Sequence, residues 1–76
     1  MNAQHHKATP SFPLGYHYLT EIDAIAKAKM YSLIYEDYYI YVYLSNSSGR
    51  YRHDYIGLRY SDEKLICVIS NGEKTL

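Results

Sequence analysis

The polar and apolar positions between residues 20 and 34 predict a helix. Thr20 stands three residues before Asp23, the spacing at which a hydroxyl caps the first backbone amides, and acidic residues in the first turn favour the helix dipole. Apolar positions at helical spacing predict a buried stripe of Ile22, Ile25, Ala26 and Leu33, with Met30 at its margin. Lys29 falls inside that stripe, so we expect its ammonium to reach outward along its aliphatic stem.

Three segments after the helix predict strands. Residues 38–44 (YYIYVYL) alternate between two side-chain types, which places Tyr38, Ile40, Val42 and Leu44 on the helix side and Tyr39, Tyr41 and Tyr43 on the opposite face. After a turn at residues 46–49, residues 50–60 are expected to return as a strand. Its helix side would hold Ile56, Leu58 and Tyr60, and its opposite face Tyr51, His53, Tyr55 and Arg59. A turn at residues 61–64 precedes the apolar run of residues 65–70, which we expect to be covered on both faces.

These segments predict an α+β fold in which one helix packs on a three- to four-stranded antiparallel sheet, arranged as a meander. We expect a single domain over residues 14–72 and a frayed tail over residues 73–76. Residues 1–13 are predicted to form a flexible N-terminal arm, either mobile or docked in extended form. Residues 14–19 alternate weakly, which suggests a short edge strand.

The feature of the composition that bears most on function is the abundance of tyrosine: the chain has 11 Tyr, one Phe and no Trp. A phenol combines a rigid apolar body with a polar tip, so it is favoured on surfaces that are buried upon binding. We expect another protein to bind the sheet face turned away from the helix, through Tyr39, Tyr41, Tyr43, Tyr51, His53, Tyr55 and Arg59. Replacing Tyr41 and Tyr43 by serine should then remove binding and leave the fold intact. The alternative is a solvent-facing sheet surface stabilised by cross-strand tyrosine pairs.

The charge balance bears on other partner classes. Eight basic and eight acidic residues give a formal net charge of zero, which removes long-range attraction to nucleic-acid phosphates. Arg50 and Arg52 lie among tyrosines and keep open a nucleic-acid-binding alternative, with Arg59 as a third contact. A further alternative is a homo-oligomeric structural protein whose tyrosine faces pack on each other.

No pattern in the chain indicates catalysis, a cofactor or a metal site. The single cysteine, Cys67, excludes an internal disulfide, and its apolar neighbours predict a buried thiol. His53 and Asp54 are adjacent in a strand and would point to opposite faces, so they do not form a catalytic dyad. We therefore expect a non-enzymatic protein without a cofactor. The lack of a disulfide and of an apolar targeting or membrane-spanning stretch favours the cytoplasm.

The order of elements resembles that of small phage-encoded anti-CRISPR proteins. The resemblance is one of layout and size: an alanine-rich helix at residues 23–29 (DAIAKAK) is followed by short antiparallel strands at residues 39–44 and 51–60. It spans roughly residues 20–70. It implies a stoichiometric inhibitor that docks on a CRISPR effector complex in the host-cell cytoplasm and blocks DNA access or recruitment.

Overall fold

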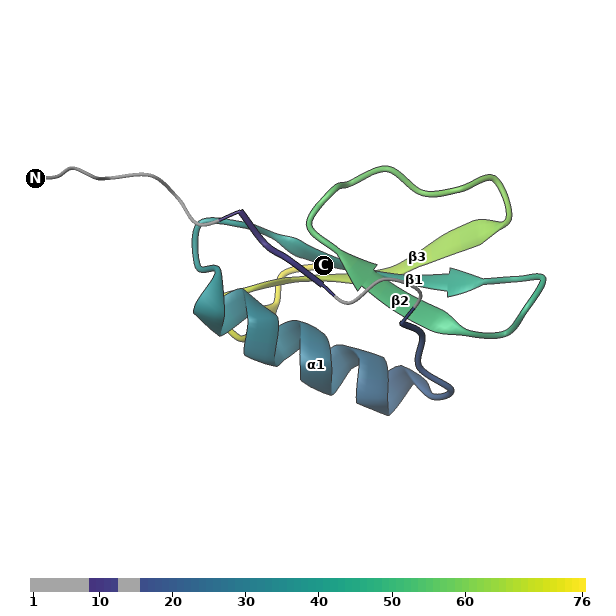
Figure 1. The fold of residues 1–76 in the computed structure, drawn as a ribbon, viewed down its shortest axis with the longest axis horizontal. Coiled ribbons are helices and arrows are strands. Elements are labelled where there is room, and N and C mark those ends of the chain that lie inside the picture. Colours follow the sequence, from purple (N-terminus) through teal and green to yellow (C-terminus); the bar gives the residue numbers. More distant parts are fainter. Residues whose placement is uncertain (1–8, 13–15) are drawn as a thin grey trace, which may run out of the picture.

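The computed structural model describes residues 9–12 and 16–76, and it shows one helix packed against a four-stranded antiparallel sheet (Figure 1). The elements follow in the chain as α1 (Glu21–Ile34), β1 (Ile40–Ser45), β2 (Tyr51–Asp54), β3 (Glu63–Ser70) and β4 (Glu73–Lys74). The predicted α+β fold class is confirmed. The strand order is β2-β1-β3-β4, so β3 pairs with β1 and not with β2 as in the predicted meander.

α1 begins where the capping pattern predicted. Thr20 is the N-cap, and its Oγ1 accepts a hydrogen bond from the Asp23 amide at 3.2 Å. The face that packs on the sheet differs from the predicted stripe, because its buried residues are Ala24, Ala28 and Ser32. Ile22 and Leu33, predicted to be buried, are 80% and 61% exposed. Small side chains on the inner face let the helix lie close to the strands, and the larger ones are left outside.

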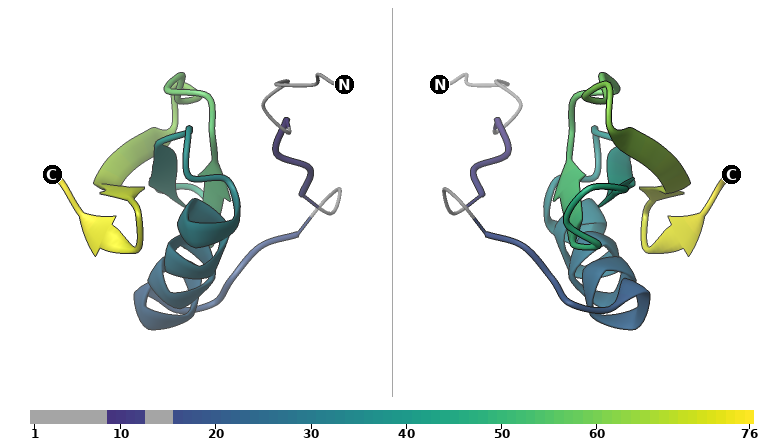
Figure 2. Two further views of the ribbon diagram at one scale, coloured as in Figure 1. Left: turned by 90° about the vertical axis from the view of Figure 1, so that its left-hand side faces the viewer. Right: turned by 90° about the vertical axis from the view of Figure 1, so that its right-hand side faces the viewer.

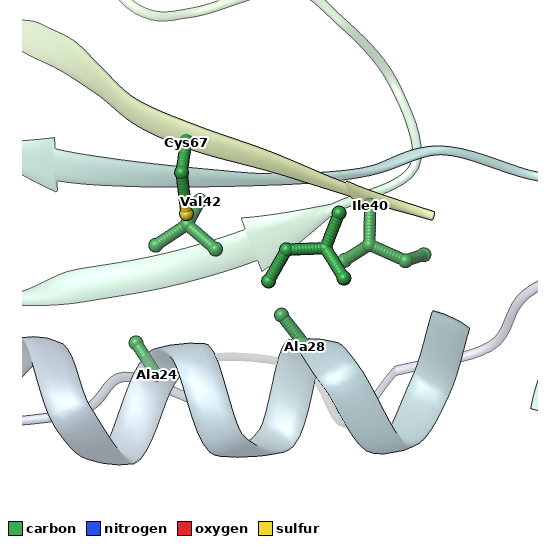
Figure 3. Close-up of a cluster of buried hydrophobic side chains, with 6 residues drawn as sticks. Ala24, Ala28, Ile40, Val42 and Cys67 are labelled. Atoms are coloured by element: carbon green, nitrogen blue, oxygen red, sulfur yellow. The ribbon is translucent and has the colours of Figure 1, made fainter. Parts of the chain in front are cut away.

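The core lies between the inner face of α1 and the two central strands (Figure 3). It consists of Ala24, Ala28, Ile40, Val42, Cys67 and Ile69. Ile40 and Val42 take the helix side, as the alternation of β1 predicted, and they stand opposite Ile69 and Cys67 of β3. Burial raises the pKa of the Cys67 thiol, and the predicted core position of this residue is confirmed.

The register between β1 and β2 overturns the predicted tyrosine face. Ser45 N–H donates to the Arg50 carbonyl at 2.9 Å, so four residues separate this pair and odd positions of β1 stand opposite even positions of β2. Val42 consequently stands opposite His53. Tyr51 and His53 point toward the helix, on the opposite side from the face where the sequence pattern placed them.

The second strand is also shorter than predicted. β2 ends at Asp54, and residues 55–62 leave the sheet as a loop that rises above it in Figure 1. We call residues 55–62 the β2–β3 loop. Ile56 and Leu58, predicted to face the helix, are exposed in this loop.

The end of the chain is paired with the sheet. Asn71 and Gly72 have φ values of 50° and 80°, the left-handed pair that forms a tight hairpin turn. The chain then returns as β4, and the Thr75 amide donates to the Val68 carbonyl at 2.8 Å. The prediction of a frayed tail is therefore wrong for the residues that pair here.

Part of the predicted N-terminal arm is docked. Of residues 1–13 the structure describes 9–12, and the rest lies outside the described residues. The Phe12 ring packs 4.8 Å from that of Tyr31 on α1 and 4.7 Å from that of His53 on β2. Within the described part of the chain, no helix has the length and apolarity needed to cross a membrane.

Candidate functional site

The sheet face turned away from α1 is covered by the β2–β3 loop. Tyr43 lies on this face, yet it is only 2% exposed, and its hydroxyl donates to the Ile56 carbonyl at 3.1 Å. The Tyr41 ring is stacked against the Tyr43 ring at 6.3 Å. Gly57 lies so close to Tyr41 that a Cβ at this position would come within 2.9 Å of a ring carbon. Tyr41 and Tyr43 therefore form a floor beneath the loop, and they are not an open docking surface.

Arg52 holds the loop to this floor. Its guanidinium lies between the rings of Tyr43 and Tyr60, 4.5 and 4.8 Å from their centroids. Nε and Nη2 donate to the two carboxylate oxygens of Glu63 at 2.6 and 2.8 Å, and Nη1 donates to Asp54 at 3.2 Å. The hydrogen bonds from Arg52 hold the pKa of the buried Glu63 below its usual value. This planar, two-point pairing suits arginine and not lysine.

Further hydrogen bonds fix the loop backbone. The Tyr60 amide donates to Oε1 of Glu63 at 2.8 Å, and Nη2 of Arg52 donates to the Leu58 carbonyl at 3.4 Å. Arg59 donates from Nη1 to the Glu63 carbonyl at 3.0 Å. A loop without regular secondary structure thus has a defined path.

The same loop carries large apolar side chains to the surface. Ile56, Leu58 and Tyr60 are 44%, 75% and 67% exposed, and we call these three residues the loop rim. Because the backbone beneath them is fixed, little conformational entropy is lost when a partner covers them. Of these residues, Tyr60 is of a type enriched at binding hot spots, and Ile56 and Leu58 add apolar area that a partner can bury.

The structure separates the predicted partner-binding residues into three groups. On the accessible surface or in the loop itself lie Tyr39, Tyr55 and Arg59, of which Tyr55 is partly buried against the core. Beneath the loop lie Tyr41 and Tyr43. On the helix side of the sheet lie Tyr51 and His53. The single predicted face is therefore replaced by a loop that stands on two of its tyrosines.

The predicted nucleic-acid contacts are separated as well. The Arg52 charge is paired with Glu63 and Asp54, and its side chain is 13% exposed, so it is not free to bind phosphate. Arg50 lies exposed at the turn between β1 and β2. The nucleic-acid alternative accordingly depends on Arg50 and Arg59.

His53 is the centre of a second cluster, on the helix side. It is 1% exposed, and each ring nitrogen has a phenol partner: the Tyr16 hydroxyl lies 2.8 Å from Nδ1 and the Tyr18 hydroxyl 3.0 Å from Nε2. Tyr18 also forms an isolated antiparallel bridge with Tyr51, at the edge where a short strand was predicted. Burial lowers the pKa of His53 to about 4. A neutral ring at pH 7 suits a packing contact that fixes the N-terminal segment to the sheet.

Other candidate chemistry is also placed by the structure. His53 stands opposite Val42 and Asp54 opposite Tyr41, so the two residues point to opposite faces, as predicted. Across residues 9–12 and 16–76, no three His, Cys, Asp or Glu side chains are grouped so that they could hold a metal ion.

Sequence reasoning missed the carboxylates that pair with Arg52. Glu63 lies eleven residues further along the chain, and the two side chains meet because Arg52 stands opposite Tyr43 while Glu63 stands opposite Ser45. Only the position of β1 between β2 and β3 brings these residues together. Asp54 was the one local signal, because it stands two residues after Arg52 and therefore on the same face of a strand.

No protein-family model, curated protein or solved structure matches this chain. Its function is therefore inferred from the geometry of its own residues.

Proposed function

We propose that this protein is a non-enzymatic module that binds another protein stoichiometrically through the β2–β3 loop. The observation that supports this function is the loop rim, in which Ile56, Leu58 and Tyr60 expose large apolar side chains on a fixed backbone. Exposing three large apolar side chains of one loop to water is unfavourable, and a rigid support lowers the entropic cost of covering them. Tyr41 and Tyr43 contribute indirectly, since they support the loop from below.

Two further residues extend the proposed contact surface. Arg59 belongs to the same loop, and Tyr39 precedes β1 with its side chain exposed, whereas Tyr55 is partly buried against the core. Three anchor residues that contribute about 2 kcal/mol each would supply about half of the roughly 12 kcal/mol that a nanomolar complex requires. A micromolar to nanomolar complex is within reach of such a surface.

One concrete partner class is a CRISPR effector complex. What supports this choice is the resemblance in layout and size to phage-encoded anti-CRISPR proteins, in which an alanine-rich helix precedes short antiparallel strands. We propose this class as the first to test. A protein of this kind acts in the cytoplasm of the host cell and blocks DNA access or recruitment.

The test compares two leucines of equal exposure. Leu58 lies on the loop rim and Leu76 at the C-terminus, and both are 75% exposed. Leu58→Ser should weaken partner binding by about tenfold or more, whereas Leu76→Ser should leave it unchanged. Binding is measured by titration against purified CRISPR effector complexes, together with inhibition of their DNA cleavage. Circular dichroism verifies that both variants are folded.

Two outcomes contradict the proposal. Binding that survives both Leu58→Ser and Tyr60→Ser would place the contact away from the loop rim. Binding to DNA or RNA that declines steeply with added salt, and that disappears in Arg50→Ala, would favour the nucleic-acid alternative.

A further inference from the structure

The outer side of α1 carries an apolar stripe that is largely exposed, although its last member, Leu33, also contacts Gly72 in the turn between β3 and β4. Its members are spaced four, four and three residues apart: Ile22, Ala26, Met30 and Leu33. Ile22 is 80% exposed, Met30 41% and Leu33 61%. α1 forms the lower border of the molecule in Figure 1, and the two side views of Figure 2 show it on the outside of the sheet as well. Such spacing is typical of a helix that packs against another helix.

We infer that a second copy of this chain docks on this stripe, helix against helix, about a two-fold axis near Ala26. Ala26 is small, so the two helices can approach closely at the centre of the contact. Ile22 and Met30 lie one turn to either side and can interdigitate with the same residues of the second copy. A two-fold axis requires this self-complementarity, because each copy presents the same patch.

The charges beside the stripe suit this arrangement. Asp23 and Lys27 lie one helical turn apart on the same flank of the stripe. Both ion pairs among the described residues are formed by Arg52, so neither of them involves Asp23 or Lys27. When two helices run antiparallel about Ala26, Asp23 of each copy lies beside Lys27 of the other. The formal net charge of zero also means that two copies do not repel each other at long range.

The surface is hollowed next to the stripe. An open hollow of about 480 Å³ is lined by Tyr18, Asp23, Ala26, Lys27 and Met30. The antiparallel arrangement brings Met30 of the second copy level with Ile22, one residue before Asp23 in the lining of this hollow. A long, flexible thioether side chain adapts to a recess of this kind.

The remainder of the same chain does not suit the stripe. Residues 1–8 (MNAQHHKA) and 13–15 (PLG) together contain two large apolar side chains, Met1 and Leu14.

The contact area sets the strength of the dimer. A helix of 14 residues is about 21 Å long, so two such helices bury well under the roughly 800 Å² per partner of a stable complex. We therefore expect a weak dimer that forms at high micromolar concentration.

Sedimentation velocity from low to high micromolar concentration tests this inference. We expect a reversible monomer–dimer equilibrium, which Ile22→Glu weakens by about tenfold or more. Leu58→Glu is the matched control, since Leu58 is similarly exposed on the loop and should leave the dimer intact. Lys27→Glu should also weaken the dimer, and adding Asp23→Lys to that variant should restore it, because the charge pair is then reversed and re-formed.

Three results would overturn the inference. A monomer at every concentration removes the dimer, and a dimer that survives Ile22→Glu places the interface elsewhere. If the stripe binds another protein and not a second copy of this chain, this face belongs to a different partner. Partner binding that survives both Leu58→Ser and Tyr60→Ser contradicts the proposed function and leaves the dimer unaffected, so the two proposals fail separately.

Discussion

At the scale of single residues, the position of the β2–β3 loop depends mainly on the contacts of Arg52. It pairs with Glu63 and Asp54, stacks between Tyr43 and Tyr60, and is 13% exposed. Charges removed from water are stable only when they are paired, so each partner depends on the other. Tyr43 belongs to the same buried group, so we expect its replacement by serine to destabilise the fold as well.

We expect Arg52→Met to lower the free energy of unfolding by about 3 kcal/mol, because the buried Glu63 carboxylate loses its partner. Urea unfolding measures the change. Adding Glu63→Gln to this variant should recover part of the loss, since a neutral amide is less costly to bury than a carboxylate. A loss of less than about 1 kcal/mol in Arg52→Met would show that the pair is effectively solvated.

At the scale of elements, α1 has two apolar faces with different side-chain sizes. The inner face carries Ala24, Ala28 and Ser32, and the outer face carries larger side chains such as Ile22 and Leu33. Ser32 also joins the helix to the sheet, because its Oγ accepts a hydrogen bond from the Gly72 amide at 2.8 Å. The helix therefore lies at a distance set by small residues, which leaves no room for larger ones.

Two alanines of α1 test this spacing. Ala28→Leu should lower the free energy of unfolding by about 2 kcal/mol or more, because the added side chain does not fit between helix and sheet. Ala26→Leu, on the exposed face, should change it by less than about 0.5 kcal/mol. Thermal unfolding at low protein concentration compares the two without interference from association. Equal losses would mean that both positions are packed.

At the scale of the whole molecule, a chain of 76 residues has little core, and aromatic residues outside the helix–sheet contact extend it. Phe12, Tyr16 and Tyr18 cover His53 and tie the N-terminal segment to β2. This cluster depends on a neutral imidazole, because burial disfavours the imidazolium and the charge of Asp54 offsets this only in part.

Stability should consequently fall on mild acidification. The unfolded chain takes up a proton on His53 near the ordinary pKa of 6.5, whereas the folded protein does so at about 4. Between these values the unfolded state binds more protons, so the free energy of unfolding decreases as the pH falls from 7 to 5. Urea unfolding at several pH values measures the slope. His53→Gln should remove it, and an equal slope in both proteins would contradict the burial of a neutral His53.

The fold class and several local features could be predicted because they depend on neighbouring residues. The Thr20 cap, the turn at residues 46–49, the alternation of Ile40 and Val42, and the core position of Cys67 are all local patterns. The candidate site could be predicted only in part. Tyr55 and Arg59 lie in the loop, but Leu58, which the pattern predicted to face the helix, is exposed in that loop.

The sequence by itself determined the helix start, the central strand and the abundance of tyrosine available for contacts. Only the tertiary structure decided which helix face is buried, since Ala24 and Ala28 fit against the sheet and Ile22 does not. It also decided which way β2 faces and that Arg52 meets Glu63. Register and strand order depend on residues far apart in the chain, because a shift of one residue turns every side chain to the other face of a sheet.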